Sequence, residues 1–250
     1  MKASKIVRIV SLALALVLAC AALAGCGGSK KETLTMGTNA AFPPYEYYDG
    51  DSIVGIDAEV AQLIADKLNM QLEIKDMEFE GIIGAVQAGS IDIGMAGMTV
   101  NAERQKSVDF TDSYAKGIQV VIVKEDSTIK STDDLKGKKI GVQSSTTGDI
   151  YATDDFGEDN VKRYSNGAAA VEAMLSGVVD AVIIDNEPAK AFVKANAGTK
   201  ILETEYANED YAIAVSKNNT ELLNKVNDAL KSLIEDGSVQ KIIDKYISAE

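Results

Sequence analysis

The sequence of 250 residues contains no histidine, and it has only three prolines and two cysteines. The lack of histidine excludes Ser-His-Asp and Cys-His catalytic arrangements, His-ligated zinc and haem sites, and the usual general base near neutral pH. Basic side chains are also scarce, with 25 lysines and arginines against 38 acidic residues and a formal net charge of -13. Because this charge would repel a phosphate backbone, we do not expect a nucleic-acid partner.

Common enzyme signatures are missing as well. The sequence has no phosphate-binding G-x-x-x-x-G-K-[ST] loop, no G-x-G-x-x-G after a strand, no G-x-S-x-G, no C-x-x-C and no EF-hand loop. Their absence weakens an enzymatic interpretation, and we expect neither a cofactor nor a metal. With 46% hydrophobic and 25% charged residues, the composition is that of a globular protein of one or two domains.

What the N-terminus does have is the pattern of a secretory signal. Three basic residues, Lys2, Lys5 and Arg8, precede an apolar run over residues 9–24. This run is shorter than the roughly 20 clean apolar residues that a membrane span needs. The pattern therefore predicts an export signal rather than a transmembrane helix.

The run ends in Leu-Ala-Gly-Cys at residues 23–26, which resembles a bacterial lipobox. In lipoproteins cleavage precedes the cysteine, so the resemblance implies that residues 1–25 are removed and that Cys26 becomes a lipid-bearing N-terminus. The mature protein would be anchored to the cell membrane, facing the extracellular or periplasmic side, with residues 26–33 as a flexible tether. An ordinary signal peptide or an anchor helix is the alternative.

From Leu34 onward, short apolar runs alternate with stretches of helical periodicity, which is typical of an α/β fold. Asp57 is expected to cap a helix, and residues 117–124 form a β-branched run of the kind that is buried on both faces of a sheet. A second unit beginning near Lys139 repeats the same strand-helix plan. The pattern also predicts strands over 71–77, 161–164, 181–184 and 211–215, and helices over 80–88, 168–176, 220–235 and 239–247.

Polar and aromatic residues gather at the strand-to-helix turns, where open α/β sheets bind ligands. In the first such segment, residues 37–45, two prolines follow Phe42, whose alternative role is to fill the core. In the second segment Phe79 precedes an amphipathic helix. Its alternative role is a hydrophobic staple against that helix.

The third segment, residues 96–104, leads from a strand into the start of a helix. Free backbone N–H groups and the positive end of the helix dipole favour a carboxylate at such a place. Arg104 adds a planar guanidinium that can hold a carboxylate with two hydrogen bonds. The alternative is a solvated side chain, although a cation at a helix N-terminus is unfavourable unless an anion compensates it.

The fourth segment consists of residues 143–148 and 180–186, which both follow strands of the second unit. Hydroxyl and N–H groups of 143–148 could complete a carboxylate site. Asp185 could accept hydrogen bonds from an ammonium group. Capping of the following helix is an equally favoured role for Asp185.

Together these segments resemble the solute-binding proteins of polar amino acid ABC importers, a family that also includes the ligand domains of ionotropic glutamate receptors. The resemblance covers residues 34–247 and rests on GTNAAFPPYEY at 37–47, GIDAEVAQ at 55–62, AGMTVNAERQKSVDFTDSY at 96–114, GVQSSTTGD at 141–149 and DAVIID at 180–185. It implies a type II periplasmic-binding-protein-like fold, in which two α/β lobes are joined by two hinge strands and close over a ligand. Lobe 1 would comprise 34–117 plus 212–250, and lobe 2 would comprise 118–211.

The resemblance also implies a set of ligand-binding residues. Arg104 falls where the family holds the α-carboxylate, and Asp185 matches the ammonium acceptor. The full set is Asn39, Phe42, Phe79, Gly97, Met98, Thr99, Arg104, Gln143, Thr146, Thr147 and Asp185. Asn39 replaces an aspartate that is frequent in this turn among basic and glutamine binders, so a cationic ligand is less assured. Glu46, Glu78 and Glu80 lie near these segments in the sequence, without an indication of which face the site.

The implied function is that of a membrane-tethered, monomeric receptor that captures a free polar L-amino acid and delivers it to an ABC permease without making or breaking a bond. One alternative is an amino acid or prephenate-type dehydratase on the same scaffold, with Glu78 or Asp185 as the acid or base. The other is a surface lipoprotein with no role in transport.

Overall fold

The computed structural model describes residues 31–203 and 206–247. The chain divides into residues 1–32 and residues 33–250, and the helices and strands of the described residues belong to the second part. The predicted signal peptide and the predicted lipid attachment at Cys26 lie outside the described residues. Among the residues that are described, no helix has the length and apolar character needed to cross a membrane.

The first lobe is built on a five-stranded sheet with the order β5-β1-β6-β14-β7. Its strands are β1 (Thr33–Thr38), β5 (Gln71–Asp76), β6 (Ile93–Gly94), β7 (Val108–Phe110) and β14 (Ala214–Ser216). Strand β1 is parallel to β5 and β6, whereas β14 is antiparallel to β6 and β7. A small antiparallel sheet of β2 (Ala41–Phe42), β3 (Glu46–Asp49) and β4 (Ser52–Val54) follows β1. The sequence pattern did not indicate this small sheet.

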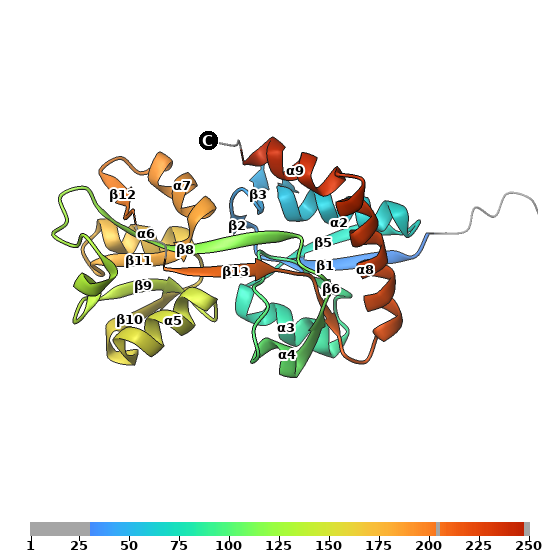
Figure 1. Cartoon of the computed structure of the whole chain (residues 1–250), viewed down its shortest axis with the longest axis horizontal. Coiled ribbons are helices and arrows are strands. Elements are labelled where there is room, and N and C mark those ends of the chain that lie inside the picture. Colours follow the sequence, from blue (N-terminus) through green and yellow to red (C-terminus); the bar gives the residue numbers. More distant parts are fainter. Residues whose placement is uncertain (1–30, 204–205, 248–250) are drawn as a thin grey trace, which may run out of the picture. The chain divides into compact units, whose positions relative to one another are not determined.

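Helices cover both faces of the first sheet (Figure 1). On one side lie α2 (Ile56–Lys67), α8 (Thr220–Glu235) and α9 (Ser238–Tyr246), and on the other lie α3 (Phe79–Ala88) and α4 (Arg104–Ser107). Helix α2 begins at Ile56 after Gly55, so the expectation that Asp57 caps it is wrong. Asp57 instead lies inside the first turn with its side chain fully buried.

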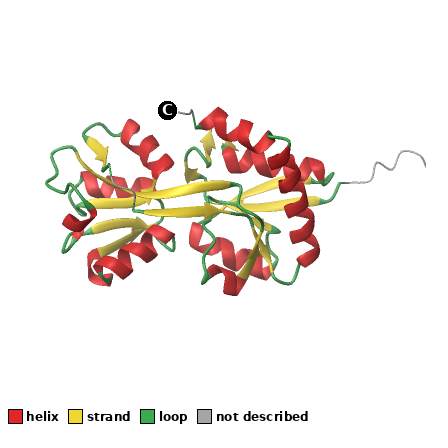
Figure 2. Cartoon of the chain, in the orientation of Figure 1, coloured by secondary structure: helices red, strands yellow, loops and turns green. Residues whose placement is uncertain are grey.

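The second lobe is built on the sheet β10-β9-β11-β8-β12, with β13 also paired to β8. Its strands are β8 (Ala115–Lys124), β9 (Ile140–Gln143), β10 (Val161–Tyr164), β11 (Ala181–Asp185), β12 (Thr199–Ile201) and β13 (Ala207–Tyr211). Its helices are η1 (Thr132–Leu135), α5 (Thr147–Phe156), η2 (Glu158–Asn160), α6 (Gly167–Leu175) and α7 (Asn186–Ala195). The alternation of strands and helices in both lobes confirms the predicted α/β fold (Figure 2).

Two long antiparallel strands, β8 and β13, run between the lobes (Figures 1 and 2). Residues 207–211 of β13 pair with residues 119–115 of β8. Gly117 of β8 packs against the ring of Tyr211, so closely that a Cβ atom at residue 117 would clash with the phenol oxygen. A glycine is therefore required at this close approach of the two hinge strands.

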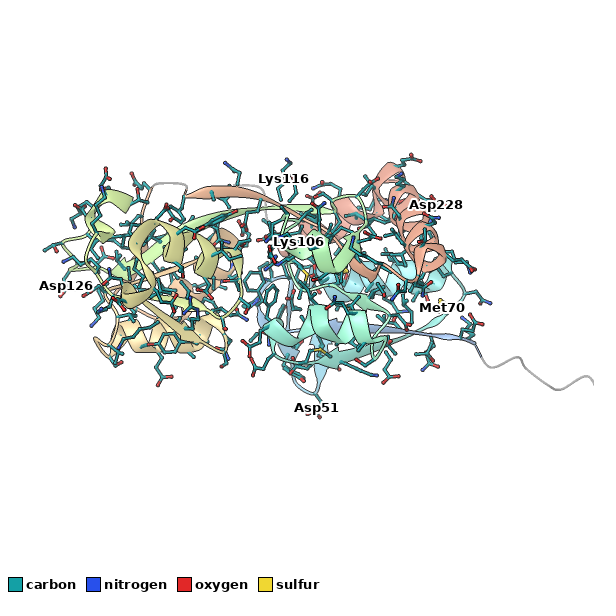
Figure 3. All side chains as sticks on the ribbon, turned by 90° about the horizontal axis from the view of Figure 1, so that it is seen from below. Asp51, Met70, Lys106, Lys116, Asp126 and Asp228 are labelled. Atoms are coloured by element: carbon teal, nitrogen blue, oxygen red, sulfur yellow. The ribbon has the colours of Figure 1, made fainter. Side chains whose placement is uncertain are left out.

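The core forms where the predicted apolar faces meet. Val60, Ala61 and Ile64 of α2 recur at helical spacing and are fully buried. Residues 120–123 of β8 are buried on both faces of the second sheet, as the continuous β-branched run predicted. The charged side chains of Lys106, Lys116, Asp126 and Asp228 are exposed (Figure 3).

Candidate functional site

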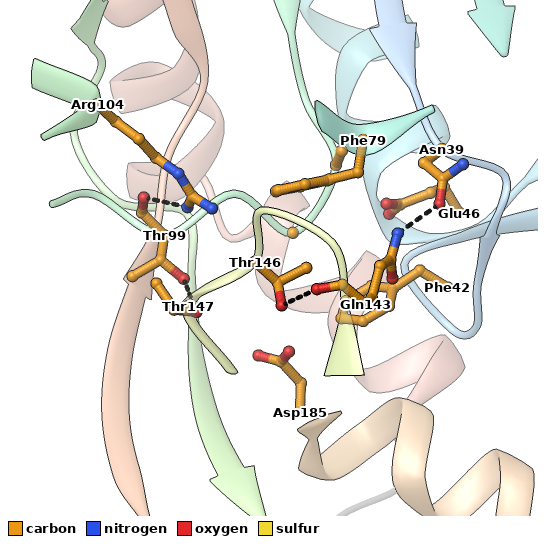
Figure 4. A pocket seen from close by; sticks show the side chains of 12 residues that line it. Asn39, Phe42, Glu46, Phe79, Thr99, Arg104, Gln143, Thr146, Thr147 and Asp185 are labelled. Carbon is orange, nitrogen blue, oxygen red and sulfur yellow. Dashed lines mark hydrogen bonds between the residues drawn. The ribbon is translucent and has the colours of Figure 1, made fainter. Parts of the chain in front are cut away.

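One pocket collects side chains from both lobes at the ends of the strands, where the sequence predicted a site (Figure 4). All of the predicted ligand-binding residues except Met98 line it, and Ala96 and Glu46 line it as well. The pocket contains about 320 Å³ of space free of protein atoms, part of which is open to solvent. Met98 packs into an apolar cluster with Ile82 and Val86 instead.

Arg104 forms one wall of the pocket with a side chain that is only 7% exposed. It is the first residue of α4, and its backbone N–H donates to Oδ1 of Asn101 at 2.8 Å. Its Nη1 donates to the carbonyl oxygen of Thr99 at 2.7 Å, and its guanidinium carbon lies 5.2 Å from the centre of the Phe79 ring. Burial lowers the pKa of Arg104 below its ordinary value.

The guanidinium of Arg104 forms no ion pair with an acidic side chain of the described residues. Arg163, by contrast, pairs with Asp149 at 2.8 Å and with Glu158 at 2.5 Å outside the pocket. A buried charge without a counter-charge in contact is costly. The guanidinium that Arg104 presents to the pocket is therefore suited to an anionic group of a ligand.

Asp185 contributes a buried carboxyl group from the second lobe, at the end of β11. It occupies the N-cap position of α7, but its side chain makes no capping hydrogen bond. Its Oδ1 instead accepts a hydrogen bond from the phenol of Tyr211. Burial, followed by the negative charge of Glu209, raises the pKa of Asp185 to about 7. A cation placed beside this carboxyl group would favour its ionised form.

Gln143, the last residue of β9, and the two residues that follow it each contact a different residue of the first lobe. The contacts are Gln143 Nε2 to Asn39 Oδ1 at 2.9 Å, Ser144 Oγ to Glu80 Oε2 at 2.8 Å, and Arg104 Nη2 to the carbonyl oxygen of Ser145 at 3.1 Å. Close by, the hydroxyl oxygens of Thr99 and Thr147 lie 3.5 Å apart. The lobes are therefore in contact around the pocket in this structure.

Aromatic side chains and one glycine shape the pocket next to these polar groups. Phe42 is buried and stacks on Tyr45 with ring centres 5.8 Å apart, so it serves the core and the pocket wall together. Phe79 is the first residue of α3 rather than the residue before it; it is half-buried, packs against the apolar cluster of Ile82 and Val86, and lies under the Arg104 guanidinium. Gly97 has a positive φ of 53°, and a Cβ atom there would lie 2.8 Å from the Phe42 ring. The backbone of Gly97 can approach a ligand because it carries no side chain.

Glu46 is the acidic side chain that the pattern left unassigned and that the structure turns inward. It is 1% exposed and lines the pocket, no N–H or hydroxyl group of the described residues donates to it, and its carboxyl group shares a hydrogen bond with that of Asp57. Burial raises its pKa well above the ordinary value, and the neighbouring Asp57 adds to this effect. Glu78 and Glu80 are exposed.

Asp57 lies behind Glu46 and accepts hydrogen bonds from the backbone N–H of Gly97 at 2.8 Å and from the phenol of Tyr114 at 2.9 Å. Burial raises the pKa of Asp57 to about 6, although these two hydrogen bonds act in the opposite direction. Asp57 therefore holds the backbone of Gly97 in place beside the pocket. No group of three or more potential metal ligands occurs in the part of the chain that the structure describes.

The geometry agrees with the comparison of the chain with known proteins. The family model of the bacterial extracellular solute-binding proteins, family 3, matches residues 34–249. The chain belongs to this family. Its function is accordingly that of an extracellular amino acid-binding protein of the ABC-transporter type, as the resemblance of its motifs implied.

Individual family members are similar over nearly the whole chain. The arginine-binding extracellular protein ArtP of Bacillus subtilis is 35% identical, with 95% of this chain and 98% of that protein covered. An ancestral arginine-binding protein, solved with bound glutamine, is 43% identical with a TM-score of 0.83 and covers 88% of this chain and 99% of its own. An ancestral amino acid-binding protein that is a precursor of cyclohexadienyl dehydratase is 33% identical with a TM-score of 0.80, covering 86% and 96% of the two chains. These structures confirm the two-lobe fold.

Proposed function

We propose that the protein captures a free polar L-amino acid as a zwitterion between its lobes and delivers it to an ABC permease. The observation that carries this proposal is one pocket lined by a buried guanidinium, Arg104, and by a buried carboxyl group, Asp185, neither of which forms an ion pair among the described residues. Arg104 binds the α-carboxylate and Asp185 accepts from the α-ammonium group. Each buried charge then meets its opposite, which is the condition for burying a zwitterion.

The remaining polar groups complete the site. Thr147 reaches the carboxylate from the second lobe, while Thr99 and Gly97 contact the polar backbone of the ligand. A ligand that touches both lobes binds the closed form better than the open form, so it shifts the equilibrium towards closure. The permease would recognise that closed form.

We further propose that the ligand side chain is cationic. Glu46 supports this preference, because it is a buried acid in the pocket wall that pairs with no cation among the described residues and shares a hydrogen bond only with another acid, Asp57. It supplies the negative charge that Asn39 lacks, since the Oδ1 of Asn39 accepts from Gln143 and its Nδ2 donates to the Met77 carbonyl at 3.0 Å. A guanidinium or ammonium group beside Glu46 would stabilise its ionised form.

We also propose that the mature protein is a monomer, attached to the cell membrane by lipid at Cys26 after removal of residues 1–25. The lipobox-like sequence at residues 23–26 supports this attachment. Metabolic labelling with a radioactive fatty acid tests it: the wild-type protein should carry the label and a Cys26→Ala variant should not. A wild-type protein without label would contradict the proposal.

The protein is proposed to bind its ligand without chemical change. The relation to a dehydratase precursor makes this worth testing, because Asp185, with its raised pKa, could in principle act as an acid or base. The test is a thermal-shift screen of the twenty amino acids on protein stripped of ligand, followed by calorimetry and by mass spectrometry of the bound ligand after long incubation. We expect one-to-one binding and recovery of the unchanged amino acid. Release of a deaminated or dehydrated product would favour the enzyme.

A further inference from the structure

Hinge strand β13 turns two buried polar side chains towards the pocket residues. Glu209 and Tyr211 are two positions apart on this strand, so their side chains lie on the same face. Glu209 is 5% exposed and Tyr211 is fully buried. Neither residue lines the pocket, yet each forms a hydrogen bond with a residue that does.

Glu209 fixes the hydroxyl group of Thr99, which belongs to the first lobe. Its Oε2 accepts from Thr99 Oγ1 at 3.0 Å and from Gln119 Nε2 at 3.0 Å. A carboxylate only accepts hydrogen bonds, so the single hydroxyl proton of Thr99 is committed to Glu209. The oxygen of Thr99 can then only accept further hydrogen bonds, either from the Thr147 hydroxyl 3.5 Å away or from a donor of the ligand such as an ammonium group.

Tyr211 fixes the carboxyl group of Asp185, which belongs to the second lobe. Its phenol donates to Asp185 Oδ1 and so orients a carboxyl group that lines the pocket, to which the side-chain amide of Gln119 and the backbone N–H of Asp185 also donate. The Tyr211 ring itself has little freedom. Gly117 packs directly against it, and Tyr45 meets it edge-on with ring centres 5.2 Å apart.

We propose that Glu209 and Tyr211 are positioning residues for the α-ammonium group of the ligand. Through them a single hinge strand orients one acceptor from each lobe, Thr99 and Asp185, towards the same donor. Because β13 runs between the lobes, recognition of the ammonium group is thereby tied to the geometry of the hinge. This inference rests on the proposed function, in which the ligand is an amino acid held by its two charged ends.

The variants Glu209→Gln and Tyr211→Phe test the proposal with almost no change of shape. The amide that the first variant introduces can donate to Thr99, which reverses the hydroxyl group and turns its proton towards the ligand ammonium. The second variant removes the donor that orients Asp185. Matched controls are Glu59→Gln, which alters a carboxylate bonded to Lys245 and Tyr246 on the outer helices, and Tyr206→Phe, which removes a phenol bonded to Asp155.

Dissociation constants are to be measured for L-arginine and L-glutamine, and for their des-amino analogues δ-guanidinovalerate and glutaramate. We expect both hinge variants to weaken binding of the amino acid by about 10- to 100-fold, as is typical for loss of a hydrogen bond to a charged group. Binding of the des-amino analogue should change little, because it has no ammonium group. The two controls should behave as the wild type with every probe.

A second readout does not depend on the analogues. The titratable or charged groups that act on Asp185 or that it acts on are Glu209, Tyr211, Tyr45, Glu46, Arg104 and Tyr151. Loss of the Glu209 charge should lower the pH below which amino acid affinity declines, whereas loss of the Tyr211 phenol should raise it. A purely structural role would not produce shifts of opposite direction.

These measurements distinguish failure of the proposed function from failure of the proposed positioning role. If the wild type binds none of the twenty amino acids, the proposed function fails. If the wild type binds an amino acid but each hinge variant weakens amino acid and des-amino analogue equally, or weakens neither, the proposed role of Glu209 and Tyr211 is overturned. The same conclusion follows if both variants move the pH dependence in one direction.

Discussion

The side-chain amide of Gln143 donates a 2.9 Å hydrogen bond to Oδ1 of Asn39, and the two residues belong to different lobes. This bond can exist only when the lobes are together. It thus stabilises the closed form independently of the two ends of the ligand, which Arg104 and Asp185 are proposed to hold. A substitution at Gln143 can therefore weaken closure without removing either residue that is proposed to hold an end of the ligand.

Replacing Gln143 should weaken ligand binding moderately. Gln143→Ala removes the hydrogen bond to Asn39 and leaves Oδ1 of Asn39 unpaired in the closed form. We therefore expect the binding free energy to weaken by about 1 kcal/mol, which is a several-fold increase in the dissociation constant. Calorimetry measures the change. Gln62→Ala is the control, because Gln62 pairs with Asp66 on the exposed face of α2. Equal affinity of Gln143→Ala and wild type would show that this bond does not contribute to closure.

Arg104→Ala should lose at least about 2 kcal/mol of amino acid binding, because the ligand carboxylate would be buried without its partner. Arg104→Lys should recover part of the loss, since lysine keeps the charge but not the planar pair of donors. Arg163→Ala serves as the control for loss of an arginine, as Arg163 pairs with Asp149 and Glu158 outside the pocket. Unchanged binding by Arg104→Ala would remove this residue from the site.

The affinity for an amino acid should depend on pH through Asp185. Its pKa of about 7 before binding falls when an ammonium group arrives, so binding releases a proton below pH 7. For a ligand with a neutral side chain, such as L-glutamine, affinity should then be constant above about pH 7 as long as the ligand ammonium stays protonated, and decrease by up to tenfold per pH unit below about pH 7. Calorimetry in buffers of different ionisation enthalpy counts the released protons. A flat profile for the wild type, or an identical profile for Asp185→Asn, would contradict this assignment.

Glu46→Gln should separate cationic from neutral ligands. The variant removes the negative charge beside the proposed side-chain position but keeps the size of the residue, so L-arginine should bind at least about tenfold more weakly. L-Glutamine should bind as well as before or better. Glu78→Gln, at an exposed position just before α3, is the matched control. If both ligands respond alike to Glu46→Gln, the cationic preference is not set by Glu46.

We expect the buried carboxyl group of Asp57 to make the stability of the fold depend on pH. Its folded-state pKa of about 6 lies above the unfolded value of 3.8, so the folded protein binds more protons between these values. The contribution of Asp57 to the free energy of unfolding is therefore fully present below about pH 4 and is lost as the pH rises through about 6, by on the order of 3 kcal/mol. Urea unfolding of the wild type and of Asp57→Asn across this pH range isolates the contribution of Asp57 to the free energy of unfolding. The difference between the two proteins should vary with pH, and a constant difference would be the contrary result.

Much of the fold was predictable because its signals are local. Helix 220–235 and strand 161–164 have the bounds that the pattern predicted, since apolar periodicity and capping residues act over a few neighbours. The small sheet β2-β3-β4 was not predicted, because its strands of two to four residues are too short for an alternating pattern. The helix start near Asp57 was misplaced for a different reason, because a buried acid in a first turn has the same local sequence as a cap.

The pocket residues proposed to contact the ligand backbone were found through family motifs, whereas Glu46 and Glu209 were not assigned. Both are glutamates in a chain rich in acidic residues, and nothing in their immediate sequence distinguishes a buried carboxyl group from a solvated one. Their burial arises from tertiary neighbours that are far away in sequence, such as Thr99, 110 positions from Glu209. Met98 shows the opposite case, since its place within a motif suggested the pocket while its side chain fills the core.

The three-residue run from Gln143 to Ser145 offers a practical use. Each of these residues meets the first lobe, and the side chain of Ser145 remains exposed while its carbonyl oxygen is engaged by Arg104. A fluorescent dye attached at this position would pass from open water to a crowded protein rim as nutrient is captured. The molecule could thereby be converted into an optical gauge of free amino acid in a culture medium.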